Sequence, residues 1–209
     1  MKYQVTPVTA YQQNSTLLWC EETMEAAITD PGGDIDGLLR NVEAAGVKLT
    51  KIILTHGHID HVGHTMELKA RTGVPVIGPH PDDAFLLSDL DDFAARTGLS
   101  HSGSIAPDAW LAEGDTVQIG NASLSVVHCP GHTPGHVVLV NEADRVAIVG
   151  DVLFQGSIGR TDFPRGNHAD LIHSIKEKLL VLGDDITFIP GHGPTSTFGA
   201  ERTGNPYLI

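Results

Sequence analysis

The chain contains 209 residues, of which 41% are hydrophobic and 19% are charged, and its formal net charge is −13. This composition predicts one folded domain over residues 1–209 and excludes a disordered chain. The acidic charge excludes nucleic acid as a partner, because phosphate binding requires clustered Lys and Arg. No apolar run approaches the roughly 18 residues of a membrane span, so we also expect no membrane partner.

The first half of the chain alternates strands and helices. Strands are predicted at residues 3–9, 15–20, 25–29, 51–55 and 74–77, and helices at residues 35–45 and 62–71. Asp30-Pro31-Gly32-Gly33 is a strong turn signal, and Gly46 is expected to end the first helix.

The second half begins with an acidic, irregular segment, residues 82–107, which predicts one helix and a covering loop. The acidic pair Asp82-Asp83 is interpreted there as part of a solvated face. Further strands are predicted at residues 116–119, 123–128, 136–140, 145–149 and 187–189, with a helix at 169–182. Both halves combine strands with helices, which favours two stacked sheets covered by helices.

The N-terminus lacks the charged head and apolar stretch of a signal peptide, which favours a cytoplasmic protein. The two cysteines, Cys20 and Cys129, are too few for a disulfide framework and are expected to be reduced. Cys129 precedes His132 by three residues and is a conceivable thiolate ligand, but we favour a small buried side chain there. The sequence carries no signal for an oligomeric state.

The heptapeptide Thr55-His56-Gly57-His58-Ile59-Asp60-His61 carries the clearest chemical signal. In an α-helix, His56 and His58 would lie about 200° apart around the axis, so their side chains can meet only on a bent loop. The apolar, β-branched residues 51–55 predict a buried strand that leads into this loop. We therefore expect a metal site at the end of a strand.

Further metal-binding side chains follow predicted strands along the chain. Asp30, Asp151 and His192 each come after a strand, and His132 lies in a loop rich in Gly and Pro. Neighbouring glycines allow the backbone to approach closely at these positions. All of these side chains are thus candidates for one rim of the fold.

This ordered set of motifs resembles the metallo-β-lactamase superfamily. Segments 129–136, 159–166 and 190–194 narrow the resemblance to the small bacterial glyoxalase II-like (hydroxyacylglutathione hydrolase) subfamily. The resemblance implies an α/β fold, a four-layer αββα sandwich in a single domain. The C-terminal helical domain of the larger glyoxalase II enzymes would be missing.

The resemblance also implies a ligand set for two divalent metal ions, with zinc expected and iron or manganese as alternatives. His56, His58 and His132 would bind the first ion. Asp60, His61 and His192 would bind the second, and Asp151 would bridge the two. Asp30 would hold the ligands in place without touching metal. His80, His101, His168 and His173 are expected to be surface or core residues. His64, His128 and His136 lie close to the motifs, and we expect them to support the ligands or to pack rather than to bind metal.

The implied activity is hydrolysis of the thioester of S-D-lactoylglutathione, or a related hydroxyacyl thioester, to glutathione and D-lactate by a metal-bound hydroxide. Asp60 and Asp151 would be the catalytic carboxylates that orient the nucleophile. Arg160 lies nine residues after Asp151, where the larger enzymes carry a basic residue that holds glutathione. Asp162 replaces their nearby tyrosine, and an ion pair between Arg160 and Asp162 is an equal alternative.

Four other functions are weighed against this one. A persulfide dioxygenase with a single iron shares several of the motifs, and a non-catalytic metal-binding scaffold would require a site closed to water. β-Lactamases with a cysteine ligand are disfavoured, because Asp151 stands where they need a thiol. Lactonases of the fold carry a tyrosine where this chain has Phe154.

Overall fold

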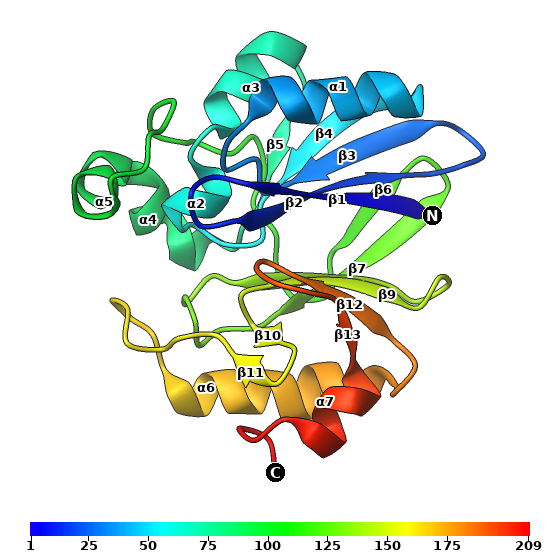
Figure 1. The fold of residues 1–209 in the computed structure, drawn as a ribbon, viewed down its shortest axis with the longest axis vertical. Helices are drawn as coiled ribbons and strands as arrows, with labels where there is room; N and C mark the ends of the chain where they lie inside the picture. Colours follow the sequence, from blue (N-terminus) through cyan, green and yellow to red (C-terminus); the bar gives the residue numbers. More distant parts are fainter.

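The computed structural model describes all 209 residues and places two β-sheets face to face between two layers of helices (Figure 1). The expected four-layer αββα sandwich is thereby confirmed. None of the helices is long and apolar enough to cross a membrane.

The first sheet comes from the N-terminal part of the chain, and its strand order follows the sequence. Its strands are β1 (Lys2–Val8), β2 (Gln13–Trp19), β3 (Glu25–Thr29), β4 (Lys48–Ile53) and β5 (Val76–Ile77). β1, β2 and β3 pair antiparallel, whereas β3, β4 and β5 are parallel. Helices α1 (Ile35–Ala45) and α3 (Thr65–Thr72) make the parallel crossovers and cover the outer face (Figure 1).

The second sheet has the order β13-β12-β9-β8-β7-β6. Its strands are β6 (Thr116–Ile119), β7 (Ala122–His128), β8 (Val137–Asn141), β9 (Val146–Gly150), β12 (Thr187–Pro190) and β13 (Ser196–Thr197). β9 and β12 are parallel. The helical crossover between them begins with α6 (His168–His173), continues as a π-helical segment, Ser174–Leu179, and ends in a 3-10 turn, Leu180–Leu182.

The central strands, such as β3, β8 and β9, are apolar on both faces, because each sheet is covered on both sides. Successive residues of a strand point to opposite faces. Accordingly Ile52 packs under the helices of the first sheet, whereas Ile53 packs between the sheets. Phe188 and Ile189 divide in the same way in the second sheet. Three apolar interfaces thus fix the four layers, and they explain why the strands appear as continuous apolar runs in the sequence.

The structure differs from the sequence prediction in short elements. Residues 82–107 contain two short helices, α4 (Ala84–Ser88) and α5 (Leu90–Thr97), after a 3-10 turn at Pro81–Asp83. The interpretation of Asp83 as a solvated residue is wrong, because its side chain is fully buried, whereas Asp82 is exposed.

Five further elements were not predicted. They are α2 (Ile59–Val62), β10 (Leu153–Phe154), β11 (Ser157–Ile158), β13 (Ser196–Thr197) and α7 (Phe198–Gly204). α7 covers the second sheet through buried Phe198, whose ring stacks on that of Phe188 at 5.7 Å between centroids. Each of these elements is too short for a hydrophobic period to develop.

Gly131 offers a test of how closely the His132 loop packs on the second helical layer. Its φ is +140°, and an added Cβ would lie 2.4 Å from the backbone N of Leu171. We expect Gly131→Ala to lower the free energy of unfolding by about 1–3 kcal/mol through overpacking, measured by denaturant unfolding. Gly204→Ala is the control, since a Cβ there meets nothing within 4 Å, and its stability should equal or slightly exceed that of the wild type. Equal stability of both variants would contradict this packing.

Candidate metal centre

Strand ends bring the candidate residues to one edge of the sandwich. Asp30 follows β3, the heptapeptide follows β4, Asp151 follows β9, and His192 comes two residues after β12. β3 and β4 are parallel, as are β9 and β12, so each pair of strands ends on the same side of its sheet. His132 lies in the loop between β7 and β8. The structure therefore places eight of the nine predicted site residues near one another. The ninth, Arg160, is described below.

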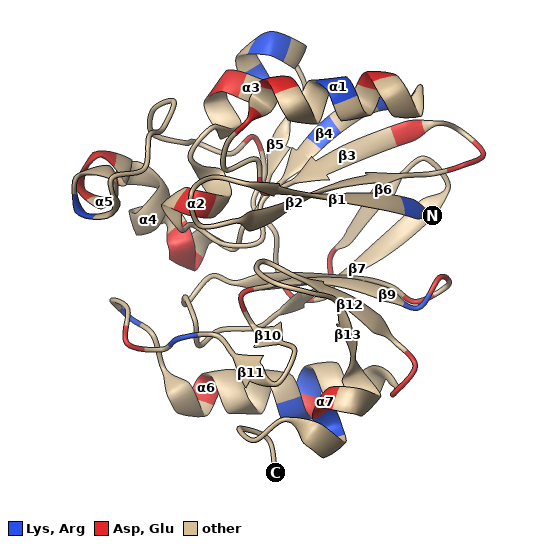
Figure 2. Cartoon of the chain, in the orientation of Figure 1, with Lys and Arg blue, Asp and Glu red and all other residues tan.

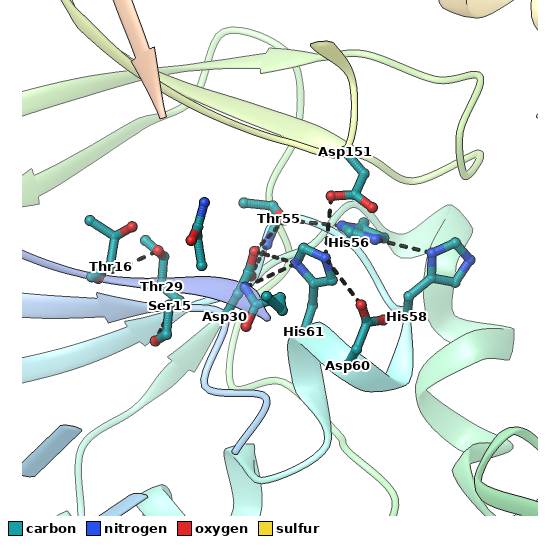
Figure 3. A network of polar contacts seen from close by, with 12 residues as sticks. Ser15, Thr16, Thr29, Asp30, Thr55, His56, His58, Asp60, His61 and Asp151 are labelled. Atoms are coloured by element: carbon teal, nitrogen blue, oxygen red, sulfur yellow. Dashed lines mark hydrogen bonds and ion pairs between the residues drawn. The ribbon is translucent and has the colours of Figure 1, made fainter. Parts of the chain in front are cut away.

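The heptapeptide divides into a bent loop and the first turn of α2, so that Asp60 and His61 lie on a short helix rather than on the loop. Gly32 allows this turn to pack against the Asp30 turn, because a Cβ at Gly32 would lie 1.6 Å from the Asp60 carbonyl oxygen. Buried Asp30 then joins the parts (Figure 3). Its carboxylate accepts hydrogen bonds from Thr55 N at 2.8 Å, Thr55 Oγ1 at 2.6 Å and His61 Nδ1 at 2.9 Å.

Three imidazoles form the first group: His56, His58 and His132. His58 Nδ1 lies 3.1 Å from His56 Nε2 and 2.9 Å from His132 Nε2. His132 Nδ1 donates to the Arg160 carbonyl oxygen at 2.7 Å, which leaves a lone pair on Nε2. The Thr55 hydroxyl donates to Asp30 and so accepts from His56 Nδ1, which leaves His56 Nε2 with a lone pair as well. One proton on His58 cannot satisfy both neighbours, but a cation between the three nitrogens can.

The second group combines Asp60, His61 and His192. His61 Nδ1 donates to Asp30, and His192 Nδ1 donates to the Tyr11 carbonyl oxygen at 3.1 Å. The Nε2 atoms of both rings therefore face carboxylates. His192 Nε2 lies 3.1 Å from Asp60 Oδ2, and His61 Nε2 lies 3.9 Å from the same oxygen.

Asp151 lies between the two groups. Its carboxylate oxygens are 3.3 Å from His61 Nε2, 3.5 Å from His132 Nε2 and 3.7 Å from His192 Nε2. His61 Nε2 and Asp151 Oδ1 are buried and have no hydrogen-bond partner. Buried polar atoms without a partner are costly, so this pair points to a missing cation. Nitrogen and carboxylate donors of this kind fit zinc, iron or manganese.

The two groups differ in their protonation. Burial lowers the pKa of His58 to about 3, and burial with the neighbouring His61 lowers that of His56. For His61, burial acts in the same direction, but the charges of Asp151 and Asp60 outweigh it and raise the pKa well above its usual value. The hydrogen bond to Asp60 likewise outweighs burial and raises the pKa of His192. Without metal, the first group thus favours neutral imidazoles, whereas the second group favours protonated ones.

Three residues outside the predicted ligand set support the site. His136 accepts a hydrogen bond from Asp151 N at 3.0 Å and stacks on the His56 ring, so it helps to hold both ligands in position. Thr55 orients His56, and Asp83 contacts two ligand loops. Thr55 lies inside the heptapeptide and His136 inside the 129–136 motif, so both had a signal in the sequence, whereas Asp83 had none. His64 bonds to Glu67 and Ser100 near the surface.

A cleft of about 840 Å³ opens above the metal-binding groups. His58, Asp60, His132, Asp151 and His192 contribute to it, and its remaining lining is rich in aromatic and aliphatic side chains. These come from four segments: Tyr11, Ile59, Phe93, Phe154, Ile158 and Phe163. A concave apolar site with a few convergent polar groups is the usual form of a small-molecule pocket.

Arg160 lines this cleft, but its guanidinium is engaged by Asp162. Nε and Nη2 donate to the two carboxylate oxygens at 2.9 and 2.7 Å, and the guanidinium lies 4.5 Å from the ring centre of Phe163. Both charged side chains remain about two-thirds exposed. The loop between β11 and α6 carries basic and acidic residues together (Figure 2). The ion-pair alternative for Arg160 is therefore the one observed.

The protonation difference predicts how the two groups bind metal. A metal ion must displace the protons on His61 and His192, so affinity at the second group should fall as the pH drops. Between pH 8 and pH 6 we expect about a tenfold loss per pH unit for each displaced proton, and a much weaker dependence at the first group. Zinc titration of metal-stripped protein, with and without His192→Ala, measures both. Equal pH dependence of the two binding events would contradict the assignment.

Comparison with known proteins supports the geometry. Residues 8–198 match the Metallo-beta-lactamase superfamily. Hydroxyacylglutathione hydrolase GloC of Haemophilus influenzae is 46% identical over 209 residues, or 100% of this chain and 98% of that protein. The crystal structure of BLEG-1 B3 metallo-beta-lactamase has a TM-score of 0.92 and 34% identity, with 99% of each chain covered. That of TTHA1623 in a di-iron-bound form has a TM-score of 0.90 and 35% identity, covering 98% of this chain and 100% of the other. The chain therefore belongs to the metallo-β-lactamase superfamily and to its glyoxalase II-like subfamily.

Proposed function

We propose that this chain is a binuclear metallohydrolase that cleaves the thioester of S-D-lactoylglutathione, or of a related hydroxyacyl thioester, to glutathione and D-lactate. The observation that carries the proposal is the position of Asp151 between two groups of metal-binding side chains at the base of a cleft. The 46% identity to a protein named hydroxyacylglutathione hydrolase supports the choice of substrate.

His56, His58 and His132 would hold one divalent ion, and Asp60, His61 and His192 the other. Zinc is the expected metal, with iron or manganese as alternatives, and two such ions would supply Lewis acidity and hydroxide near neutral pH. Asp151 would contact both ions. Asp30 would fix the tautomer of His61 through its hydrogen bond to Nδ1.

Asp60 and Asp151 present carboxylate oxygens to the cleft and would orient the attacking oxygen toward the acyl carbon. Phe163 and Phe154 flank the metal-binding groups, since their rings contact His58 and His192 respectively. These side chains would exclude bulk water from the reacting atoms. A thiolate departs with little need for a general acid, so the carboxylates and imidazoles already described suffice for a thioester.

β-Lactam hydrolysis is a second candidate, favoured by the likeness to a protein named B3 metallo-β-lactamase. The persulfide dioxygenase suggested by the sequence motifs is a third. Substrate assays distinguish all three, because only the dioxygenase consumes oxygen and only the lactamase opens a β-lactam ring.

The first test uses Asp60→Asn. We expect the wild type to cleave S-D-lactoylglutathione and the variant to lose at least about 100-fold in kcat/KM, because a metal ligand and orienting carboxylate is removed. The variant should remain folded with only a small fall in melting temperature, because the apolar layers hold the sandwich and only one ligand of one ion is removed. Global unfolding of the variant would favour a scaffold. One iron per chain with oxygen uptake on glutathione persulfide, and no thioester cleavage, would overturn the proposal.

The second test concerns Arg160, which we propose contacts the glutathione part of the substrate through donors that compete with Asp162. An exposed ion pair contributes about 0.2–1 kcal/mol, so Asp162→Asn should lower KM for S-D-lactoylglutathione by at most about fivefold. Arg160→Gln should raise KM, and neither change should alter kcat much. A thioester of a neutral thiol serves as the control substrate. Identical KM values for wild type and both variants would exclude a role for Arg160 in binding.

A further inference from the structure

Asp83 is a buried carboxylate that lies outside the ligand set. It ends the 3-10 turn Pro81–Asp83, in the segment between β5 and α4, and its side chain is fully buried. No Lys or Arg pairs with it in the structure. Burial raises its pKa to about 6, whereas hydrogen bonds from Thr133, Gly57 and Gly135 oppose the rise and keep it ionised at neutral pH. A charge in such a place is costly unless it is fully hydrogen-bonded.

The partners of Asp83 belong to two different ligand loops. Oδ2 accepts from Gly57 N at 2.9 Å and from Thr133 Oγ1 at 2.8 Å, and Oδ1 accepts from Gly135 N at 2.6 Å. Gly57 lies between His56 and His58, and Thr133 follows His132 directly. One carboxylate thus joins the loops that carry all three imidazoles of the first group.

The surrounding backbone leaves these loops little room to move. A Cβ at Gly57 would lie 2.6 Å from the Cβ of Leu86, and one at Gly135 would lie 2.5 Å from Asp83 N. His80 N also donates to the Gly135 carbonyl oxygen at 3.1 Å. The Asp83 segment is therefore seated directly against both loops.

The chemistry of the contact requires a carboxylate. All three partners donate, so both oxygens must accept, and an amide in place of the acid would turn an NH₂ group toward an N–H donor. Donors left without an acceptor in a buried position cost about 1–3 kcal/mol each. Asparagine at this position would therefore lose at least the contact with Gly135 N and weaken the connection between the two loops.

We propose that Asp83 is a positioning residue that fixes the separation of His58 and His132 and thereby the metal affinity of the first group. This inference rests on the metal centre of the proposed function. It assigns to the 82–107 segment a role in building the site, through its buried first turn, and the same segment supplies Phe93 and Thr97 to the cleft wall.

The test measures cobalt(II) binding to metal-stripped protein in a His192→Ala background, where only the first group remains intact. Adding Asp83→Asn should weaken cobalt binding about 10–100-fold and change the visible absorption of the bound ion. Asp82→Asn is the matched control, since its side chain is exposed, and it should leave both readouts unchanged. In a His58→Ala background, binding at the second group should be unaffected by Asp83→Asn.

Thr133→Val keeps the test valid if Asp83→Asn fails to fold, because it removes only one of the three donors and should weaken cobalt binding by a smaller factor. Unchanged affinity and spectrum with a lowered melting temperature would overturn the positioning role and leave the metal centre intact. Absence of cobalt binding by the His192→Ala parent would instead overturn the first metal site itself, and the inference with it.

Discussion

The site depends on which ring nitrogen of each histidine carries a proton. In four of the five candidate imidazole ligands, one ring nitrogen donates to a fixed acceptor outside the cluster: Thr55, Asp30, the Arg160 carbonyl or the Tyr11 carbonyl. Each opposite nitrogen must then direct its lone pair, or a bound proton, inward. The inward lone pairs of the first group cannot satisfy one another, and the carboxylates of the second group draw protons onto His61 and His192. The hydrogen bonds around the site therefore orient its donor atoms for cations before any cation binds.

The fold meets this constraint through its apolar layers. Three buried interfaces hold the strands in register, so the polar loops at their ends are placed by packing that lies far from the chemistry. Asp30 and Asp83 then connect the loops to one another through buried hydrogen bonds. Rigid strands with hydrogen-bonded loops are the arrangement expected for a site that must hold several ligands at once.

Much of this could be predicted from the sequence. The long apolar strands, α1 with its Gly46 end and the metal-binding character of the heptapeptide all follow from local patterns. The β10–β11 hairpin has only two residues per strand, and α7 buries only Phe198 and Glu201. Neither element therefore creates a detectable hydrophobic period. The burial of Asp83 could not be predicted from the sequence for another reason. An acidic pair resembles a solvated surface, and only tertiary contacts from residues about 26 and 50 positions away make one member of the pair a buried acceptor.

The division of the donors between the two sheets has a further consequence. His56, His58, Asp60 and His61 come from loops of the N-terminal sheet, whereas His132, Asp151 and His192 come from loops of the C-terminal sheet. Each group draws on both sheets, so a bound ion would cross-link the two halves of the sandwich at their open edge. Because the unfolded chain offers no such arrangement, the ion would act as a reversible staple and stabilise the protein in proportion to the logarithm of its free concentration. The free metal concentration would then affect the free energy of unfolding as well as the activity of the site.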